Sequence, residues 1–311
     1  MRLLNSRDQT FGSFDGEAVP PYAILSHTWG DGEVTHQDMV AWIYERKGSR
    51  SFREKKGFLK IDLTCKQADH DGLDWVWIDT CNIDKTSSSE LSEAINSMFQ
   101  WYKNAAICYV YLEDISCDDL VSSEGTTRLM PEVLRSARWF SRGWTLQELL
   151  ASEKMNLFCA VPGHSQWSFI GSKDSVSMYL ATITGIDRAV LEEPDLLPTV
   201  SVARRMSWAA RRETTRPEDI AYCLLGVFQV NMPLLYGEGA NAFIRLQEEI
   251  IKTSEDESLF AWTPKPSLIS NSQVNDGILA SHPKAFSESS EIVPYASKLA
   301  PYNMTNRGLH I

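Results

Sequence analysis

Short apolar runs bounded by polar turns recur through the first half of the chain, and this pattern predicts β-strands. The run AICYVYL within 105–112 carries no charge, which is typical of a parallel strand that is covered on both faces. Segments with helical spacing lie between the runs. Such alternation predicts an α/β fold, with a parallel sheet flanked by helices. The predicted strands are residues 21–29, 73–79, 105–112 and 154–161.

Helical spacing is clearest over residues 88–103. Five apolar side chains there repeat with a period of 3.6 residues, and Ser87 with Glu90 has the spacing of a capping box. A further helix is predicted to end near Gly72, and another covers 141–151.

The second half of the chain has a different pattern. Helical spacing dominates from about residue 175 to 253, with amphipathic helices predicted at 218–229 and 238–252. Residues beyond 263 are loop-like, and the last 35 residues carry only weak strand signals. We therefore expect three parts. They are an α/β domain (1–165), a helical extension packed on it (166–262) and a loop-rich tail that begins a truncated following region (263–311).

Composition and charge narrow the class of protein. The chain has 311 residues, among them 10 tryptophans, which is enough for a substantial core. Its formal net charge of −11 argues against binding to nucleic acid or to an anionic membrane. The basic pairs Arg204-Arg205 and Arg211-Arg212 could still hold a phosphate, although such pairs are more often solvated helix faces.

The redox state and location of the protein are also predicted from the sequence. The six cysteines show no CxxC pair, so we expect buried free thiols in a reducing compartment. No stretch approaches 18 apolar residues, and the amino terminus lacks the apolar run of a signal peptide. The sequence therefore predicts a soluble, cytoplasmic protein.

Several chemistries have little support in the sequence. The phosphate-binding pattern GxxxxGK[ST] is absent, and no group of His, Cys and Asp residues has the spacing of metal ligands. We therefore expect no metal and no bound cofactor. A nucleophilic pair of Cys81 with His27 remains an alternative, since both residues follow predicted strands.

Three long strings resemble the fungal heterokaryon incompatibility (HET) family. They are YAILSHTWG (22–30), the stretch from LDWVWID to CYVYL (73–112) and ARWFSRGWTLQELLA (137–151). The family usually has two cysteines where this chain has Cys81-Asn82, so we propose no mechanism that needs a second thiol. The resemblance implies a role in programmed cell death after non-self recognition between fungal cells.

A more distant resemblance, to TIR domains, suggests a reaction. HET domains are similar to TIR domains, whose flavodoxin-like fold hydrolyses NAD in several lineages. The TIR pattern Trp-Cys-x-x-Glu-Leu is similar to WTLQEL at 144–149, where Thr145 replaces the cysteine. This alignment puts Glu148 at the position of the catalytic glutamate. The resemblance therefore implies cleavage of the nicotinamide–ribose bond, in which a carboxylate stabilises positive charge on the ribose.

Residues after the predicted strands are candidates for binding NAD, because ligands of open parallel sheets bind beyond the carboxyl ends of the strands. Lys85 and Arg142 are suited to a pyrophosphate, and Trp144 lies one turn before Glu148 on the same helix face. The other candidates are Ser26, His27, Trp29, Asp79 and Cys81. Each has a structural alternative: the tryptophans as core residues, His27 as a hydrogen-bonding residue, Asp79 as a turn cap, and Arg142 and Glu148 as surface residues.

Two functions other than catalysis fit the same residues. The HET region could be a death-signalling adaptor that assembles with itself or with a receptor-type protein. It could also bind NAD or a related nucleotide without turnover, as a sensor.

Overall fold

The computed structural model describes residues 1–44, 52–120, 130–264, 277–294, 302–305 and 308–310. The chain forms two compact units. Unit 1 consists of residues 1–140 and 151–183, and unit 2 consists of residues 141–150 and 184–311. Each unit is described separately below.

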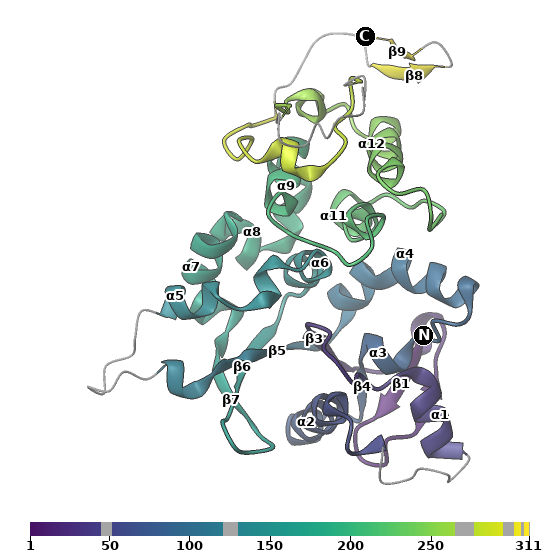
Figure 1. Cartoon of the computed structure of the whole chain (residues 1–311), viewed down its shortest axis with the longest axis vertical. Coiled ribbons are helices and arrows are strands. Elements are labelled where there is room, and N and C mark those ends of the chain that lie inside the picture. Colours follow the sequence, from purple (N-terminus) through teal and green to yellow (C-terminus); the bar gives the residue numbers. More distant parts are fainter. Residues whose placement is uncertain (45–51, 121–129, 265–276, 295–301, 306–307, 311) are drawn as a thin grey trace. The chain divides into compact units, whose positions relative to one another are not determined.

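Unit 1 contains a seven-stranded sheet in the order β2-β1-β4-β3-β5-β6-β7 (Figure 1). The four central strands β4, β3, β5 and β6 are parallel to one another, as the sequence predicts, and the flanking strands β1 and β7 pair antiparallel with β4 and β6. The strands are β1 (Arg2–Asn5), β2 (Phe11–Ser13), β3 (Ala23–His27), β4 (Trp75–Trp77), β5 (Ile107–Ser116), β6 (Met155–Ala160) and β7 (Trp167–Ser172).

The four parallel strands are ordered second, first, third, fourth along the chain. This is how the flavodoxin-like order 2-1-3-4-5 begins, in which ligands bind at the switch point between the first and third strands. That point lies between β3 and β5 here. All five residues of β3 are buried, which agrees with a strand covered on both faces.

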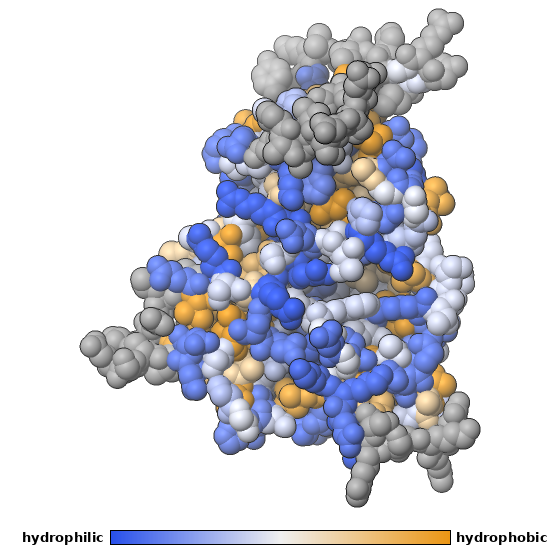
Figure 2. All heavy atoms as spheres, viewed as in Figure 1, coloured by the Kyte–Doolittle hydropathy of each residue, from blue (hydrophilic) through white to orange (hydrophobic). Residues whose placement is uncertain are grey.

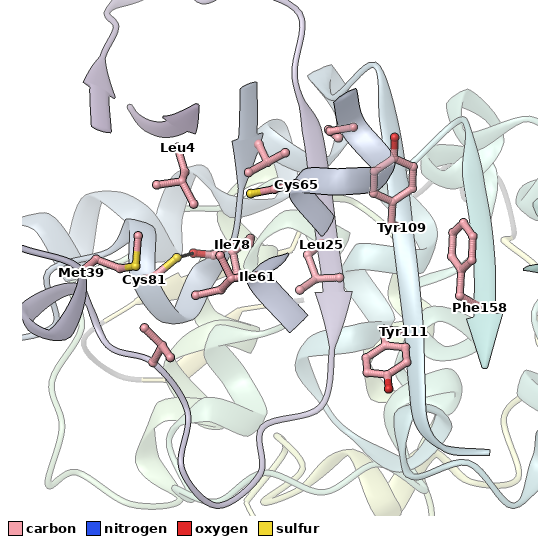
Figure 3. Packing of buried hydrophobic residues seen from close by; sticks show 14 of the residues in the cluster. Leu4, Leu25, Met39, Ile61, Cys65, Ile78, Cys81, Tyr109, Tyr111 and Phe158 are labelled. Carbon is pink, nitrogen blue, oxygen red and sulfur yellow. Dashed lines mark hydrogen bonds between the residues drawn. The ribbon is translucent and has the colours of Figure 1, made fainter. Parts of the chain in front are cut away.

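Helices cover both faces of this sheet (Figure 1). On one face, Trp77 of β4 packs edge-on against Trp101 and Tyr102 of α4. On the other, Leu25 and Val76 pack in a cluster with residues of α1 and α2 (Figure 3). The helices of unit 1 are α1 (His36–Tyr44), α2 (Lys56–His70), α3 (Asp79–Asn82), α4 (Ser88–Asn104), α5 (Met130–Arg135) and most of α7 (Lys173–Thr184).

Only half of the predicted capping box forms at the start of α4. The Ser87 side chain accepts a hydrogen bond from the Glu90 amide, as the box requires. The Glu90 carboxylate instead accepts from the Asp84 amide and from the Arg2 guanidinium. Arg2 belongs to β1, so the start of α4 is tied to the sheet.

Unit 2 is mainly helical, as the sequence predicts for this half of the chain. The predicted helix 218–229 is two short helices, which meet at Cys223 and Leu224 and end where Gln229 adopts a left-handed conformation. The helices are α6 (Trp144–Ala151, of which 144–150 belong here), α8 (Arg188–Glu192), α9 (Val202–Ala209), α10 (Asp219–Tyr222), α11 (Leu225–Phe228) and α12 (Asn241–Thr253).

Short elements complete the described part of the chain. A two-stranded sheet is formed by β8 (Asn303–Thr305) and β9 (Gly308–His310). The 3-10 helices are η1 (Gly16–Ala18), η3 (Cys117–Leu120), η4 (Arg138–Ser141), η5 (Pro194–Thr199), η6 (Glu257–Phe260) and η8 (Pro283–Phe286).

Two predictions for the region after β5 are wrong. The acidic segment 113–125 has the composition of a loop in the sequence, but it begins as strand, since β5 extends to Ser116 and η3 follows; residues 121–129 lie outside the described part. The expectation of six free thiols fails because Cys117 and Cys159 form a disulfide. The other four cysteines are free and buried.

Figure 2 shows hydrophilic residues over most of the described surface on this face, with hydrophobic residues in scattered groups. Among the described residues, no helix is both long enough and apolar enough to cross a bilayer.

Candidate functional site

Four predicted site residues lie together at the carboxyl ends of β3 and β4. His27 is the last residue of β3, and Asp79 begins α3 directly after β4. The His27 Nδ1 atom lies 3.8 Å from Asp79 Oδ1. The indole Nε1 of Trp29 donates to Asp79 Oδ2 at 2.8 Å, and the Lys85 ammonium lies 3.4 Å from the centre of the Trp29 ring. We call His27, Trp29, Asp79 and Lys85, with the residues that contact them, the His27 cluster.

His27 is held uncharged between two carboxylates. Its side chain is 2% exposed, and burial together with the nearby charge of Lys60 lowers its pKa to about 3. Glu33 Oε2 lies 3.9 Å from His27 Nε2, opposite Asp79. Among the described residues, neither ring nitrogen has a hydrogen-bond partner. His27 thus offers one N–H donor and one acceptor inside the cluster, and neither is used by a described residue.

The exposed part of the cluster is Trp29. It is 49% exposed, while Asp79 beneath it is largely enclosed. Burial raises the pKa of Asp79, and the neighbouring Lys85 opposes that rise. Burial lowers the pKa of Lys85, and the charge of Asp79 counters the shift. The Lys85 ammonium therefore has two internal partners, the Asp79 carboxylate and the Trp29 ring.

Sequence reasoning missed the charged residues that support this cluster. Lys60 of α2 donates to the Thr28 carbonyl oxygen at 3.0 Å and to Glu33, and its ammonium lies 3.1 Å from Glu113 Oε2. Glu113 belongs to β5, so three parallel strands contribute to the cluster at their carboxyl ends. The sequence does contain a signal for this site. Lys60 and Thr64 are polar residues on the buried stripe of α2, where apolar residues are expected.

Two other predicted residues lie inside unit 1 rather than in this cluster. Ser26 is fully buried, and its hydroxyl accepts from the Trp139 indole at 2.8 Å. Cys81 packs with Met39 and Ile78 in the hydrophobic core (Figure 3). Burial raises the pKa of the Cys81 thiol well above its usual value. A neutral, enclosed thiol is a poor nucleophile, so the pairing of Cys81 with His27 has little chemical support.

Unit 2 contains the predicted residues Glu148, Trp144 and Arg142. It also contains Arg212, which the sequence pattern favours as part of a solvated helix face. Glu148 is 6% exposed, so it is not a surface helix residue. Burial lowers the pKa of Arg212 to about 10, while the charges of Cys223 and Glu148 act to raise it. Arg212 donates to the Arg142 carbonyl oxygen at 2.8 Å and to Thr145 Oγ1 at 2.9 Å. Arg212 is therefore a buried cation beside α6, not part of a solvated face.

Trp144, predicted to stack on a ring, and Arg142, predicted to bind phosphate, both have partners within the protein. Trp144 hydrogen-bonds the carboxylate of Asp219, and the Arg142 guanidinium donates to Thr215 Oγ1 at 3.0 Å. Arg142 also pairs with Glu213 in an isolated β-bridge. The proximity of Glu148 to Ser26, His27 and Asp79 remains a prediction. Within the described residues, no three His, Cys, Asp or Glu side chains are grouped to hold a metal ion.

Comparison with known proteins identifies the family of the region that contains the His27 cluster. Residues 22–132 match the family described as heterokaryon incompatibility protein (HET). This chain is a HET-domain protein. The match contains β3, β4, β5 and every residue of the His27 cluster, whereas β6, β7 and α6 follow it. Residues 241–301 match a domain of unknown function (DUF8212).

A curated relative extends the similarity beyond the HET domain. Vegetative incompatibility protein HET-E-1 of Podospora anserina is 44% identical over 237 residues. The match covers 75% of this chain but only 16% of the relative, so the chain spans about a sixth of that protein. No solved structure matches the chain.

The HET domain contains one glycine whose replacement should displace the His27 cluster. A Cβ atom at Gly57 would lie 2.7 Å from the Glu33 Cα and 2.8 Å from the Val34 nitrogen. We expect Gly57→Ala to destabilise the protein by about 1–3 kcal/mol, because backbone has to move and the better helix propensity of alanine offsets only part of the cost. Urea unfolding would measure this loss.

Gly30, in the loop after β3 that also contains Glu33, provides the control, since the nearest atom to its added Cβ lies at 3.7 Å. We expect Gly30→Ala to change the stability by less than about 0.5 kcal/mol. Equal stability of the two variants would show that the contact between α2 and Glu33 is looser than the structure indicates.

Burial of neutral His27 predicts a loss of stability in acid. The folded pKa of about 3 lies below the unfolded value of 6.5, so this stabilisation is complete above pH 6.5 and is lost as the pH falls toward 3. From pH 7 to pH 5 the loss is about 2 kcal/mol for this one group. The raised pKa of Asp79 acts in the opposite direction, because the folded state then takes up a proton more readily.

Comparing variants isolates the His27 contribution. We expect His27→Gln to lose about 2 kcal/mol less than the wild type between pH 7 and pH 5, measured by urea unfolding at each pH. His70→Gln is the control, because that side chain is 81% exposed. If His27→Gln and the wild type lost stability equally, His27 would not be buried in its neutral form.

Proposed function

We propose that this HET domain is the cell-death-inducing part of a fungal vegetative incompatibility protein and acts in the cytoplasm. The similarity to HET-E-1 carries this proposal, since 44% identity over 237 residues reaches beyond the HET match at 22–132. The role named for the relative belongs to a much longer protein. We assign that role to the 237 residues over which the two chains match.

The proposed chemistry is hydrolysis of NAD at the nicotinamide–ribose bond, with Glu148 as the catalytic carboxylate. When this bond breaks, its electron pair passes to the pyridinium nitrogen and nicotinamide leaves as a neutral molecule. Positive charge develops on the ribose, and water then adds to the ribose carbon with loss of a proton. A carboxylate stabilises such charge far better in a buried site than in water, and Glu148 is 6% exposed.

Arg212 supports this assignment of Glu148. Its buried guanidinium interacts electrostatically with Glu148 and donates to Thr145 on the same helix. A fixed cation in this position favours the ionised form of a nearby carboxylate and restrains the start of α6. We assign nucleotide binding to the exposed Trp29 ring, to Lys85 beside it and to the unused ring nitrogens of His27.

A second candidate function is a non-catalytic adaptor that assembles with itself or with a receptor-type protein, or that senses a nucleotide without turning it over. The observation that favours it is the internal pairing of the predicted ligand-binding groups. The Lys85 ammonium lies over the Trp29 ring and interacts electrostatically with Asp79, and Trp144 hydrogen-bonds Asp219.

Nicotinamide release separates the two candidates. The purified chain would be incubated with NAD and the products followed by chromatography, while the same chain is expressed in fungal cells and scored for NAD content and colony formation. Catalysis predicts equal amounts of nicotinamide and ADP-ribose, with cellular NAD falling before viability. Killing at constant NAD would support the adaptor, and thermal stabilisation by NAD without products would support the sensor.

A further inference from the structure

A disulfide crosses from η3 to β6 in unit 1. It joins Cys117, which follows β5 directly, to Cys159 near the end of β6, 42 residues later in the chain. Their Cα atoms are 5.7 Å apart, which is the usual spacing for such a bond. Cys117 is partly exposed, whereas Cys159 is 1% exposed. Cys117 is therefore the more accessible of the two residues to a reductant.

The remaining cysteines are poor redox groups. All four are buried. Burial raises the thiol pKa of Cys65 to about 12, and it raises the thiol pKa of Cys81 and Cys223 as well. Since the thiolate is the reactive form, these side chains are protected from oxidants and reductants. Of the six cysteines, the pair Cys117–Cys159 is the one placed for redox chemistry.

The disulfide lies where the pairing of β5 with β6 becomes irregular. Leu112 pairs with Cys159, and the next pairing is Ser116 with Ala160, so the residues between them bulge out of the ladder. A bulged strand end has fewer backbone hydrogen bonds to hold it. The disulfide at Cys117 fixes the chain directly after the bulged residues.

Two of the bulged residues, Glu113 and Asp114, are charged and contact residues at or near the His27 cluster. Glu113 lies against the Lys60 ammonium, at 3.1 Å. Asp114 accepts a hydrogen bond from the Arg138 amide at 2.8 Å. The segment that carries Glu113 is held by regular pairing at Leu112 on one side, and by the pairing of Ser116 and the disulfide at Cys117 on the other.

We propose that Cys117–Cys159 is a reversible redox clamp on the end of β5, which holds Glu113 against Lys60 when oxidised and releases it when reduced. A thiolate of a dithiol reductant attacks the Cys117 sulfur, and Cys159 leaves as a thiolate. The second thiol of the reductant then displaces Cys117. Two electrons and two protons pass to the protein, and the reductant becomes a disulfide.

Both thiols would have an interaction partner after reduction. The Cys159 sulfur lies 3.5 Å from the carbonyl oxygen of Ser168 on β7, so its thiol can donate there. Cys117, being partly exposed, can be solvated by water. Reduction therefore leaves the sheet paired and removes only the clamp beyond the bulge. This proposal does not depend on NAD hydrolysis.

Hydrogen exchange with mass spectrometry would test the clamp. The whole chain would be equilibrated in oxidised glutathione or in dithiothreitol, with alkylation by N-ethylmaleimide to count free thiols. We expect two additional free thiols after reduction, Cys117 alkylated in the native protein and Cys159 only after unfolding, and amide exchange at least about tenfold faster in peptides covering 113–118. Peptides from β3 should change little.

The variants Cys117→Ser and Cys223→Ser complete the test. Cys117→Ser should exchange like the reduced wild type in both buffers, and Cys223→Ser should respond to redox like the wild type because it retains the pair. Two free thiols at 117 and 159 in oxidised glutathione would overturn the proposal. Identical exchange of 113–118 in the oxidised and reduced wild type would also overturn it, and this comparison does not require any variant to fold.

Discussion

Nicotinamide release from NAD is expected to slow by at least about 100-fold when Glu148 is replaced by glutamine, which corresponds to about 2.7 kcal/mol of transition-state stabilisation. The amide has nearly the same shape as the carboxylate, so packing around α6 is retained. It lacks the negative charge that faces the developing positive charge on the ribose. The rate would be measured by chromatography at saturating NAD.

Glu153 supplies the matched control for this substitution. It follows Glu148 by five residues and is exposed, so Glu153→Gln makes the same chemical change outside any enclosed site. Glu148→Gln also removes a charge that acts on Arg212, so thermal unfolding of each variant must accompany the rates. Full turnover by a folded Glu148→Gln protein would remove Glu148 from the mechanism, and killing by that variant at constant NAD would favour the adaptor.

Replacing Lys60 by methionine is expected to destabilise the protein by about 3 kcal/mol. The substitution leaves Glu33 and Glu113 facing one position without a cation, and breaking a buried ion pair costs about 3–5 kcal/mol. The low end applies because Glu113 is about one-third exposed, and water screens part of its charge. Urea unfolding followed by tryptophan fluorescence would measure the loss.

The helix α2 contains its own control for Lys60. Lys66 pairs with Asp62 on the solvent side, and its side chain is 68% exposed, so Lys66→Met should cost less than about 0.5 kcal/mol. Adding Glu33→Gln to Lys60→Met should restore part of the stability, since one uncompensated carboxylate is removed. Equal effects of the two lysine substitutions would mean that the Lys60 contacts are no stronger than surface contacts.

The central sheet was predictable because its strands lie within apolar runs that are long enough to show a pattern. The apolar runs before His27 and Asp79 identify β3 and β4, and the run at 105–112 identifies most of β5. The edges were not predictable. Strands β1 and β2 have four and three residues, too few for an alternation to be recognised, and β7 mixes exposed with buried positions. Pairing with neighbours, rather than local sequence, makes these segments strands.

The candidate site was predicted in part for a similar reason. His27, Trp29, Asp79 and Lys85 follow strand ends, and topology brings strand ends together. Their supporting charges come from distant positions: Lys60 contacts Glu33, 27 residues earlier in the chain, and Glu113, which belongs to another strand. A charged residue on the buried face of a helix signals an internal partner, but only the fold identifies that partner.

The composition of the two units affects how this protein can be divided into fragments. Residues 141–150 are inserted between two segments of unit 1, yet they pack with unit 2, where Arg212 contacts Thr145 and Asp219 contacts Trp144. A fragment ending at residue 165, where the sequence suggested a boundary, would contain Glu148 without these neighbours. A fragment ending at residue 132, the limit of the HET match, would lack Glu148 altogether. Inactivity of the first fragment would reflect an unsupported α6, and inactivity of the second a missing one. Mapping by deletion would therefore mistake a structural part of unit 2 for a regulatory one.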